Sequence, residues 1–132
     1  DLIFVIGGPI TAYTGAYALR FNGDTASNYS GTGMYGNGSS AGSYRQTNDT
    51  KCYLGDGQGS EVVTNVVQIQ NYANTSVYKT ILNKKSQVTS SSVEATVGTW
   101  RSTSAINSIT VITDFSSFQA GTSFTLYGIK AA

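Results

Sequence analysis

Two short motifs in the chain have the spacing of nucleotide-binding or catalytic signatures. The first, Gly-Thr-Gly-Met-Tyr-Gly at residues 31–36, matches the G-x-G-x-x-G pattern that holds a dinucleotide pyrophosphate. That chemistry needs a helix N-terminus directly after the glycines, so that backbone N–H groups point at the phosphates. Asn-Gly-Ser-Ser follows instead at residues 37–40, and it cannot open a helix of useful length. We therefore interpret residues 31–36 as a flexible loop.

The second motif, Ser-Val-Tyr-Lys at residues 76–79, matches the S-x-x-K pattern of serine acyl-enzymes. In those enzymes one helical turn brings the lysine to the serine hydroxyl. The surrounding residues predict a strand, in which positions 76 and 79 point to opposite faces of the sheet. The match is therefore interpreted as structural.

Acid–base and metal chemistry find little support in the residue types. A glycosidase needs two converging carboxylates. Asp24 and Glu94 are a conceivable pair, but Asp24 is typical of a turn cap and Glu94 of a solvated strand face. Asp-Gly-Gln-Gly at 56–59 lacks the further carboxylates of a calcium loop. With no histidine and the single cysteine Cys52, structural zinc, His-dependent catalysis and an intrachain disulfide are excluded. We predict a protein that is not an enzyme, with no cofactor and no metal site.

Aromatic and arginine side chains are better candidates for binding. Trp100 and Arg101 are adjacent, and a tryptophan in this setting can stack on a guanidinium or on a sugar ring. Tyr29, Tyr35 and Tyr44 lie in a segment rich in Tyr, Asn and Ser, which is the composition of a recognition surface. Packing within the fold explains the same residues. The sequence favours packing and leaves ligand or partner contact open for all five.

The elements that must position these side chains are strands. Large residues alternate with small or polar ones in several segments, and no segment has a sustained helical period. Strands are expected at residues 2–6, 17–21, 62–72, 77–83, 93–101, 106–113 and 123–129, with short ones around 34–35 and 51–54. The turn-rich residues 22–60 are expected to form loops packed against the sheets. The prediction is an all-β, jelly-roll-like antiparallel β-sandwich in a single domain, residues 1–132, with no helix longer than about two turns.

Charge and hydropathy restrict the partners. Charged residues make up 11% of the 132 residues and the net charge is +1, which offers no electrostatic basis for binding nucleic acid. No apolar run approaches the length of a membrane span, so membrane insertion is not expected. The chain begins inside an apolar run at residues 2–6. We interpret it as the C-terminal part of a longer chain, with an N-terminal attachment segment upstream.

The last predicted strand carries large apolar groups on both faces. Phe124 and Leu126 alternate with Tyr127 and Ile129, so one pair is expected to face the core and the other a neighbouring subunit. A surface with so few charges favours association, and a closed ring of like subunits covers such a face. We predict a homotrimer with Tyr127 or Ile129 at or near the subunit contact.

Longer stretches resemble a known group of proteins. Gly-Thr-Trp-Arg-Ser-Thr-Ser-Ala-Ile-Asn-Ser-Ile-Thr at 98–110 and Phe-Gln-Ala-Gly-Thr-Ser-Phe-Thr-Leu-Tyr-Gly-Ile at 118–129 resemble the end of many tailed-bacteriophage virion proteins. Residues 19–24, 27–29, 69–72 and 78–80 are similar to the same group, in the same order. The resemblance covers nearly the whole chain. It implies a jelly-roll module on the particle exterior, commonly trimeric.

The function expected from this resemblance is that of a non-enzymatic structural protein on the virion surface. Capsid decoration (cement) or a head-fibre module is the leading form, with the major capsid protein or other virion proteins as partners. The alternative is a receptor-binding tail-fibre tip that recognises host surface glycans through the loops of residues 22–60 and Trp100. Analogy of fold alone does not decide between them.

Overall fold

The regular structure of the described residues consists of ten β-strands and contains no helix. The computed structural model describes residues 1–11, 15–56, 61–88 and 91–130. The strands are β1 (Leu2–Gly8), β2 (Ala16–Phe21), β3 (Tyr29–Gly36), β4 (Ala41–Asp49), β5 (Cys52–Asp56), β6 (Val63–Gln70), β7 (Lys79–Gln87), β8 (Ser92–Trp100), β9 (Ile109–Thr113) and β10 (Ser123–Gly128).

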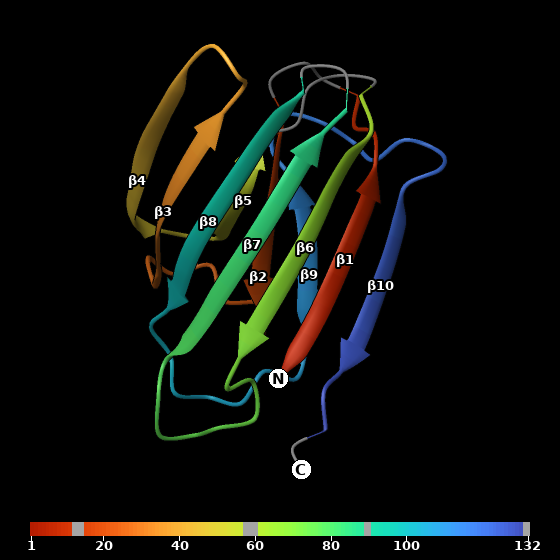
Figure 1. Ribbon diagram of the computed structural model, residues 1–132. Helices are drawn as coiled ribbons and strands as arrows, with labels where there is room; N and C mark the ends of the chain where they lie inside the picture. The colour runs from red at the N-terminus through yellow and green to blue at the C-terminus, as the bar shows by residue number, and fades with distance from the viewer. Residues whose placement is uncertain (12–14, 57–60, 89–90, 131–132) are drawn as a thin grey trace.

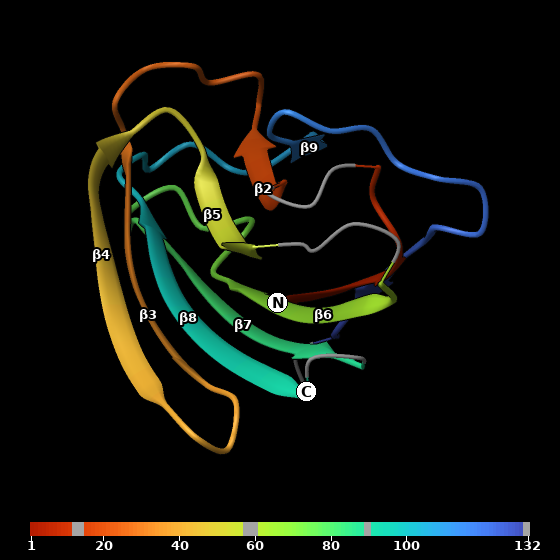
Figure 2. The same ribbon diagram turned by 90° about the horizontal axis from the view of Figure 1, so that it is seen from above.

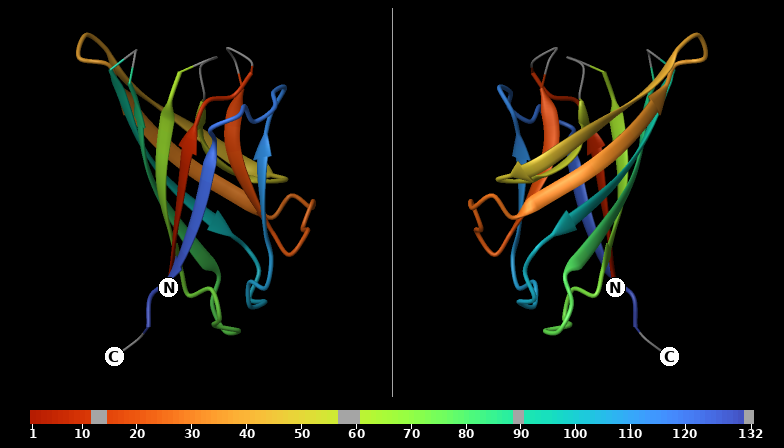
Figure 3. Two further views of the ribbon diagram at one scale, coloured as in Figure 1. Left: turned by 90° about the vertical axis from the view of Figure 1, so that its right-hand side faces the viewer. Right: turned by 90° about the vertical axis from the view of Figure 1, so that its left-hand side faces the viewer.

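These strands form two antiparallel sheets that face each other. The large sheet has the order β10-β1-β6-β7-β8-β3-β4 and the small sheet the order β5-β2-β9. The large sheet lies in front in Figure 1, with the small sheet behind it, and Figure 2 shows the large sheet curving around the small one. The predicted all-β, antiparallel sandwich is therefore confirmed. In the side views of Figure 3, the tip of the β3–β4 hairpin diverges from the small sheet.

The core lies between the sheets because apolar residues alternate along the strands that face it. In β6, for example, Val63, Val67 and Ile69 are buried while Val66 and Gln68 are exposed. An aromatic cluster fills one end of the core, where the Phe21 and Trp100 rings are 5.5 Å apart and the Tyr29 and Trp100 rings 6.3 Å apart. Burial of each large apolar side chain contributes roughly 1.5–3 kcal/mol.

The loop interpretation of residues 31–36 is wrong, because these residues belong to β3. The strand pairs with β4 on one side and β8 on the other. Gly33 lies opposite Tyr44 and Tyr35 opposite Gly42, and a Cβ on either glycine would overlap the tyrosine across from it. The glycines thus make room for cross-strand rings, a recognised use of glycine in sheets.

Candidate functional site

One face of the large sheet is left uncovered by the small sheet. We call this the outer face: the strand positions that point away from β2, β5 and β9. Its charged side chains, among the described residues, are Lys84 and Arg45, and both are cationic. Its apolar members are Ile3, Val5, Met34, Val66, Leu82, Val93, Ala95, Val97 and Tyr127. Polar side chains such as Gln68, Thr80 and Thr99 lie among them on the same face.

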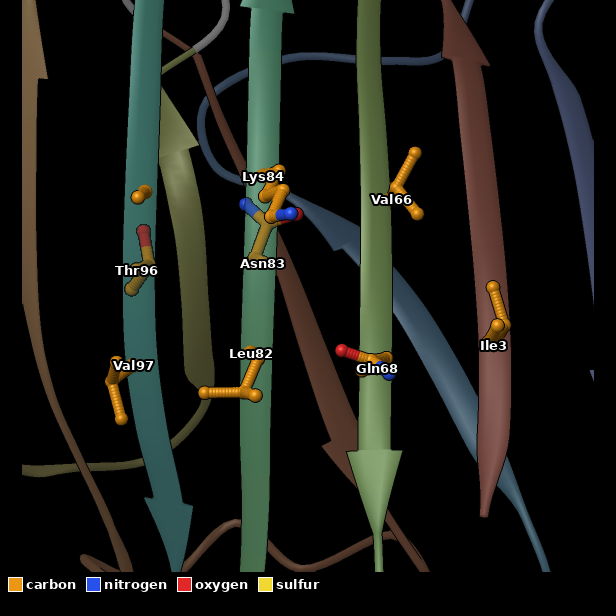
Figure 4. Close-up of a pocket in the computed structure, with 9 residues that line it drawn as sticks. Ile3, Val66, Gln68, Leu82, Asn83, Lys84, Thr96 and Val97 are labelled. Carbon is orange, nitrogen blue, oxygen red and sulfur yellow. The ribbon is translucent and has the colours of Figure 1, made fainter. Parts of the chain in front are cut away.

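A shallow hollow of about 430 Å³ lies in the middle of the outer face. Figure 4 shows Leu82, Val97 and Val66 standing on neighbouring strands around it, with Ile3 at its far side and Lys84 at one end. The lining is therefore mostly aliphatic. Such a surface suits packing against apolar side chains better than binding of a charged small molecule.

The edge strand β10 departs from its expected burial. All six of its residues are exposed, and Phe124 and Leu126, one of the two pairs considered for the core, are 45% and 52% exposed. The small sheet does not extend over this edge, and the Phe124 ring meets the Phe118 ring edge to face, with ring centroids 5.0 Å apart. The expectation that one face of this strand lies in the core is thus wrong. Tyr127, 55% exposed, lies on the outer face, and Ile129 follows the strand at 45% exposed.

The inner face of the large sheet carries a buried polar cluster near the start of β8. Lys85 and Glu94 lie directly opposite each other on β7 and β8, and Lys85 Nζ is 2.6 Å from Glu94 Oε2. Lys85 also donates a hydrogen bond to the Asp56 carbonyl, and Tyr44 donates to Glu94 Oε1. Both charged side chains are almost wholly buried. Glu94 is therefore not on a solvated face, contrary to the sequence-based expectation.

The tyrosines of this cluster are held as hydrogen-bond donors. Burial, and then the Glu94 carboxylate, raise the pKa of the Tyr44 phenol above its ordinary value. Burial and the Asp56 carboxylate do the same to the pKa of Tyr53, whose hydroxyl donates to Asp56 Oδ1. The two rings meet edge to face at 5.4 Å. Both phenols therefore remain protonated at neutral pH.

A cavity of about 350 Å³ opens onto this cluster, and we call it the polar pocket. Its lining residues are Tyr35, Asn37, Tyr44, Asp56, Lys85, Gln87, Ser92 and Glu94. Gln87 accepts a hydrogen bond from Ser92 Oγ at 3.2 Å, but its Nε2 has no partner among the described residues. A buried donor without an acceptor is rare in folded proteins and costs free energy.

The opposite end of the sandwich is tied together by Asp24. Its carboxylate accepts hydrogen bonds from Trp100 Nε1 at 2.7 Å, Asn28 Nδ2 at 2.9 Å and the Ala26 N–H at 2.9 Å. Burial alone would raise the pKa of Asp24, but these hydrogen bonds hold it below its ordinary value. The turn-cap interpretation is confirmed. Asp24 and Glu94 do not meet, because six residues of strand, about 20 Å, separate Trp100 from Glu94.

Lys79 has a structural role at the same end. It is fully buried, and its Nζ donates to the carbonyls of Asn74 at 2.7 Å, Val77 at 2.9 Å and Thr103 at 3.1 Å. Burial lowers the pKa of this ammonium group. The lysine joins the loop before β7 to the loop after β8, which agrees with the structural interpretation of the S-x-x-K match.

Within the described ranges, no group of three or more His, Cys, Asp and Glu side chains could hold a metal ion. Of the Asp-Gly-Gln-Gly segment at 56–59, which was considered as a calcium loop, only Asp56 lies within the described ranges. The same part of the chain has no helix long and apolar enough to cross a membrane. The chain matches no protein-family model, no curated protein and no solved structure at a significant level.

The five predicted contact residues are separated by the fold. Tyr29 and Trp100 lie in the core, at 0% and 2% exposed, so neither can contact a ligand in this fold. Arg101 donates to Asn48 Oδ1 at 2.9 Å and to oxygens of Ser27 and Ser30, which ties the loop before β3 to the start of β3 and the end of β4.

Only Tyr35 and Tyr44, of the predicted five, come together at one cavity, the polar pocket. Lys85 and Gln87, which line the same pocket, were not among the predicted site residues, and Glu94 was expected on a solvated strand face. The alternation along β7 does indicate that Lys85 and Gln87 face the interior, because they lie on the same strand face as the buried Ile81. The identity of the strand opposite was not visible in the sequence.

Proposed function

We propose that the chain is a non-enzymatic structural module on the exterior of a tailed-bacteriophage particle, in its leading form a capsid decoration protein. The observation that carries the proposal is the outer face, which presents exposed apolar side chains on several neighbouring strands, two cationic side chains and no carboxylate among its described strand residues. Covering such a surface against a protein shell removes apolar area from water, which favours binding. The resemblance of residues 98–110 and 118–129 to phage virion proteins supports the setting.

The proposed assembly is a homotrimer that closes along the β10 edge. The outer edge of β10 is unpaired in the structure, and an open edge is a template for pairing with another chain. Tyr127 and Ile129 lie at this edge and are about half exposed. The other edge of β10 is paired with β1, which is itself paired with β6. A cyclic arrangement covers the edge of every subunit without leaving a free one.

Substitution Ile129→Asp is expected to convert the trimer to a monomer without unfolding it. Ile129 is exposed in the single chain, so a carboxylate there remains hydrated, whereas in the trimer it would be buried and unpaired. Light scattering and sedimentation at micromolar concentration give the mass, and circular dichroism reports the fold. The control Tyr78→Asp replaces another large exposed side chain, 53% exposed against 45% for Ile129 and outside the sheet, and should stay trimeric. A wild-type monomer, or an unfolded Ile129→Asp variant, would contradict the prediction.

Particles that carry this protein are expected to retain their genome to a higher temperature than particles stripped of it. A decoration protein binds the assembled shell and not the free subunits, so it stabilises the shell by mass action. Genome release can be followed with a DNA-binding dye during heating, and adding the purified protein back should restore the higher release temperature. Identical release curves for the two kinds of particle would rule out the decoration role.

A further inference from the structure

We propose that the polar pocket binds one neutral sugar residue, because an exposed aromatic ring, two carboxylates and an unpartnered buried amide donor converge on a cavity of suitable size. The pocket is lined largely by inner-face side chains at one end of the sandwich, whereas assembly uses the outer face and the β10 edge. The sugar site is therefore independent of the proposed function, and each can fail without the other.

The size and shape of the pocket fit a sugar ring. Its volume of about 350 Å³ lies near the lower limit of roughly 300–1,000 Å³ for small-molecule sites. Tyr35 lines it with a ring that is 48% exposed, and Tyr44 lines it from the neighbouring strand. One face of a pyranose presents C–H groups, which pack on an aromatic ring, while its edges present hydroxyls.

The polar groups fit a ligand that both donates and accepts hydrogen bonds. Gln87 is 3% exposed, and no described residue accepts a hydrogen bond from its Nε2, so the pocket offers a donor that is already desolvated. The carboxylates of Asp56 and Glu94 already accept from Tyr53, Tyr44 and Lys85, and their remaining lone pairs are the acceptors of the pocket. A sugar hydroxyl satisfies both kinds of group, because it carries one donor and two acceptor lone pairs.

The charges of the pocket select against an anionic sugar. The lining holds the two carboxylates of Asp56 and Glu94 against the single ammonium of Lys85, so its formal net charge is negative. Lys85 is moreover committed to Glu94 and the Asp56 carbonyl. A uronic or sialic acid would therefore meet repulsion that a neutral hexose does not.

The test is ligand-observed NMR and calorimetry on the full chain with a panel of sugars. Glucose, galactose, mannose and N-acetylglucosamine are the neutral probes, and glucuronic acid and N-acetylneuraminic acid the anionic ones. We expect at least one neutral sugar to bind with a millimolar or lower Kd, and the anionic sugars to bind more weakly. A soluble polysaccharide bearing the same sugar at its ends distinguishes a surface glycan from the free sugar as the source of the ligand.

Variants separate binding from structure. Gln87→Met should weaken sugar binding about tenfold or more, while its melting temperature stays equal or rises because the unpartnered donor is gone. Tyr35→Ala should also weaken binding, whereas Tyr78→Ala, at 53% exposed a matched control outside the pocket, should not.

Three outcomes would overturn the proposal. They are no binding of any neutral sugar at millimolar concentration, a preference for the anionic sugars, and a Gln87→Met variant that melts lower but binds as before.

Discussion

Replacing Lys85 with methionine is expected to destabilise the folded domain by about 3–5 kcal/mol. The substitution keeps the aliphatic stem but leaves the Glu94 carboxylate buried without its counter-charge, which is 2.6 Å away in the structure. The Asp56 carbonyl loses its donor as well. The free energy of unfolding in urea, compared with that of the wild type, measures the effect.

The double variant Lys85→Met/Glu94→Gln separates the lost charge pair from lost packing. Glutamine keeps an acceptor for the Tyr44 hydroxyl and removes the unpaired charge, so it should recover much of the stability. Lys84→Met is the matched control, because Lys84 is the next residue on β7 and points to solvent on the outer face. It should change the unfolding free energy by no more than about 0.5 kcal/mol. Equal effects at positions 84 and 85 would show that the ion pair is not buried in solution.

Asp24→Ala is expected to destabilise the domain by about 2–4 kcal/mol, since it orphans the buried Trp100 N–H and removes charge-assisted hydrogen bonds. Trp100 is 2% exposed, so water cannot replace the lost acceptor without local opening. Asp24→Asn retains one carbonyl acceptor and should cost less. Near-ultraviolet circular dichroism of the single tryptophan reports whether the aromatic cluster stays ordered during the denaturation experiment.

The same carboxylate makes stability depend on pH. The pKa of Asp24 is lower in the folded protein than its ordinary value, so its contribution is present above the unfolded pKa of about 3.9. That contribution is lost as the pH falls through the folded pKa. Unfolding free energies between neutral and strongly acidic pH should therefore fall more steeply for the wild type than for Asp24→Asn. Parallel curves would exclude Asp24 as the titrating group.

Strands were predictable where apolar residues alternate with polar ones, because that pattern matches one buried and one exposed face. Residues 17–21, where large side chains alternate with Ala18 and Arg20, correspond to β2, and the unbroken apolar run at residues 2–6 corresponds to β1. The β3–β4 hairpin was not predictable in the same way, because its inner positions are Gly33, Tyr35, Gly42 and Tyr44. The volume of each tyrosine is accommodated by a glycine on the other strand, so neither strand alone has an apolar period.

The polar pocket was less predictable than the fold, because it combines residues of the β7–β8 hairpin with residues of β3, β4 and β5, much earlier in the chain. The pairing of Lys85 with Glu94 depends on the register of β7 and β8, and Tyr44 reaches them from β4. Sequence composition led instead to Trp100, which packs in the core as single tryptophans of β-sandwiches commonly do. The trimer contact at Tyr127 and Ile129 stays a prediction.

The position of β1 in the large sheet has a consequence for how the chain folds. β1 lies between β6 and β10, so residues 2–8 must pair with partners more than fifty and more than one hundred positions later. A ribosome would release β1 long before β6 and β10, because both partner strands lie so much later in the chain. Closing such long loops costs conformational entropy before any contact compensates it, and domains rich in distant pairings typically fold in roughly milliseconds to seconds. Among the described strands, β1 therefore waits longest for its first partner, and its apolar residues stay open to aggregation or chaperone binding during that time.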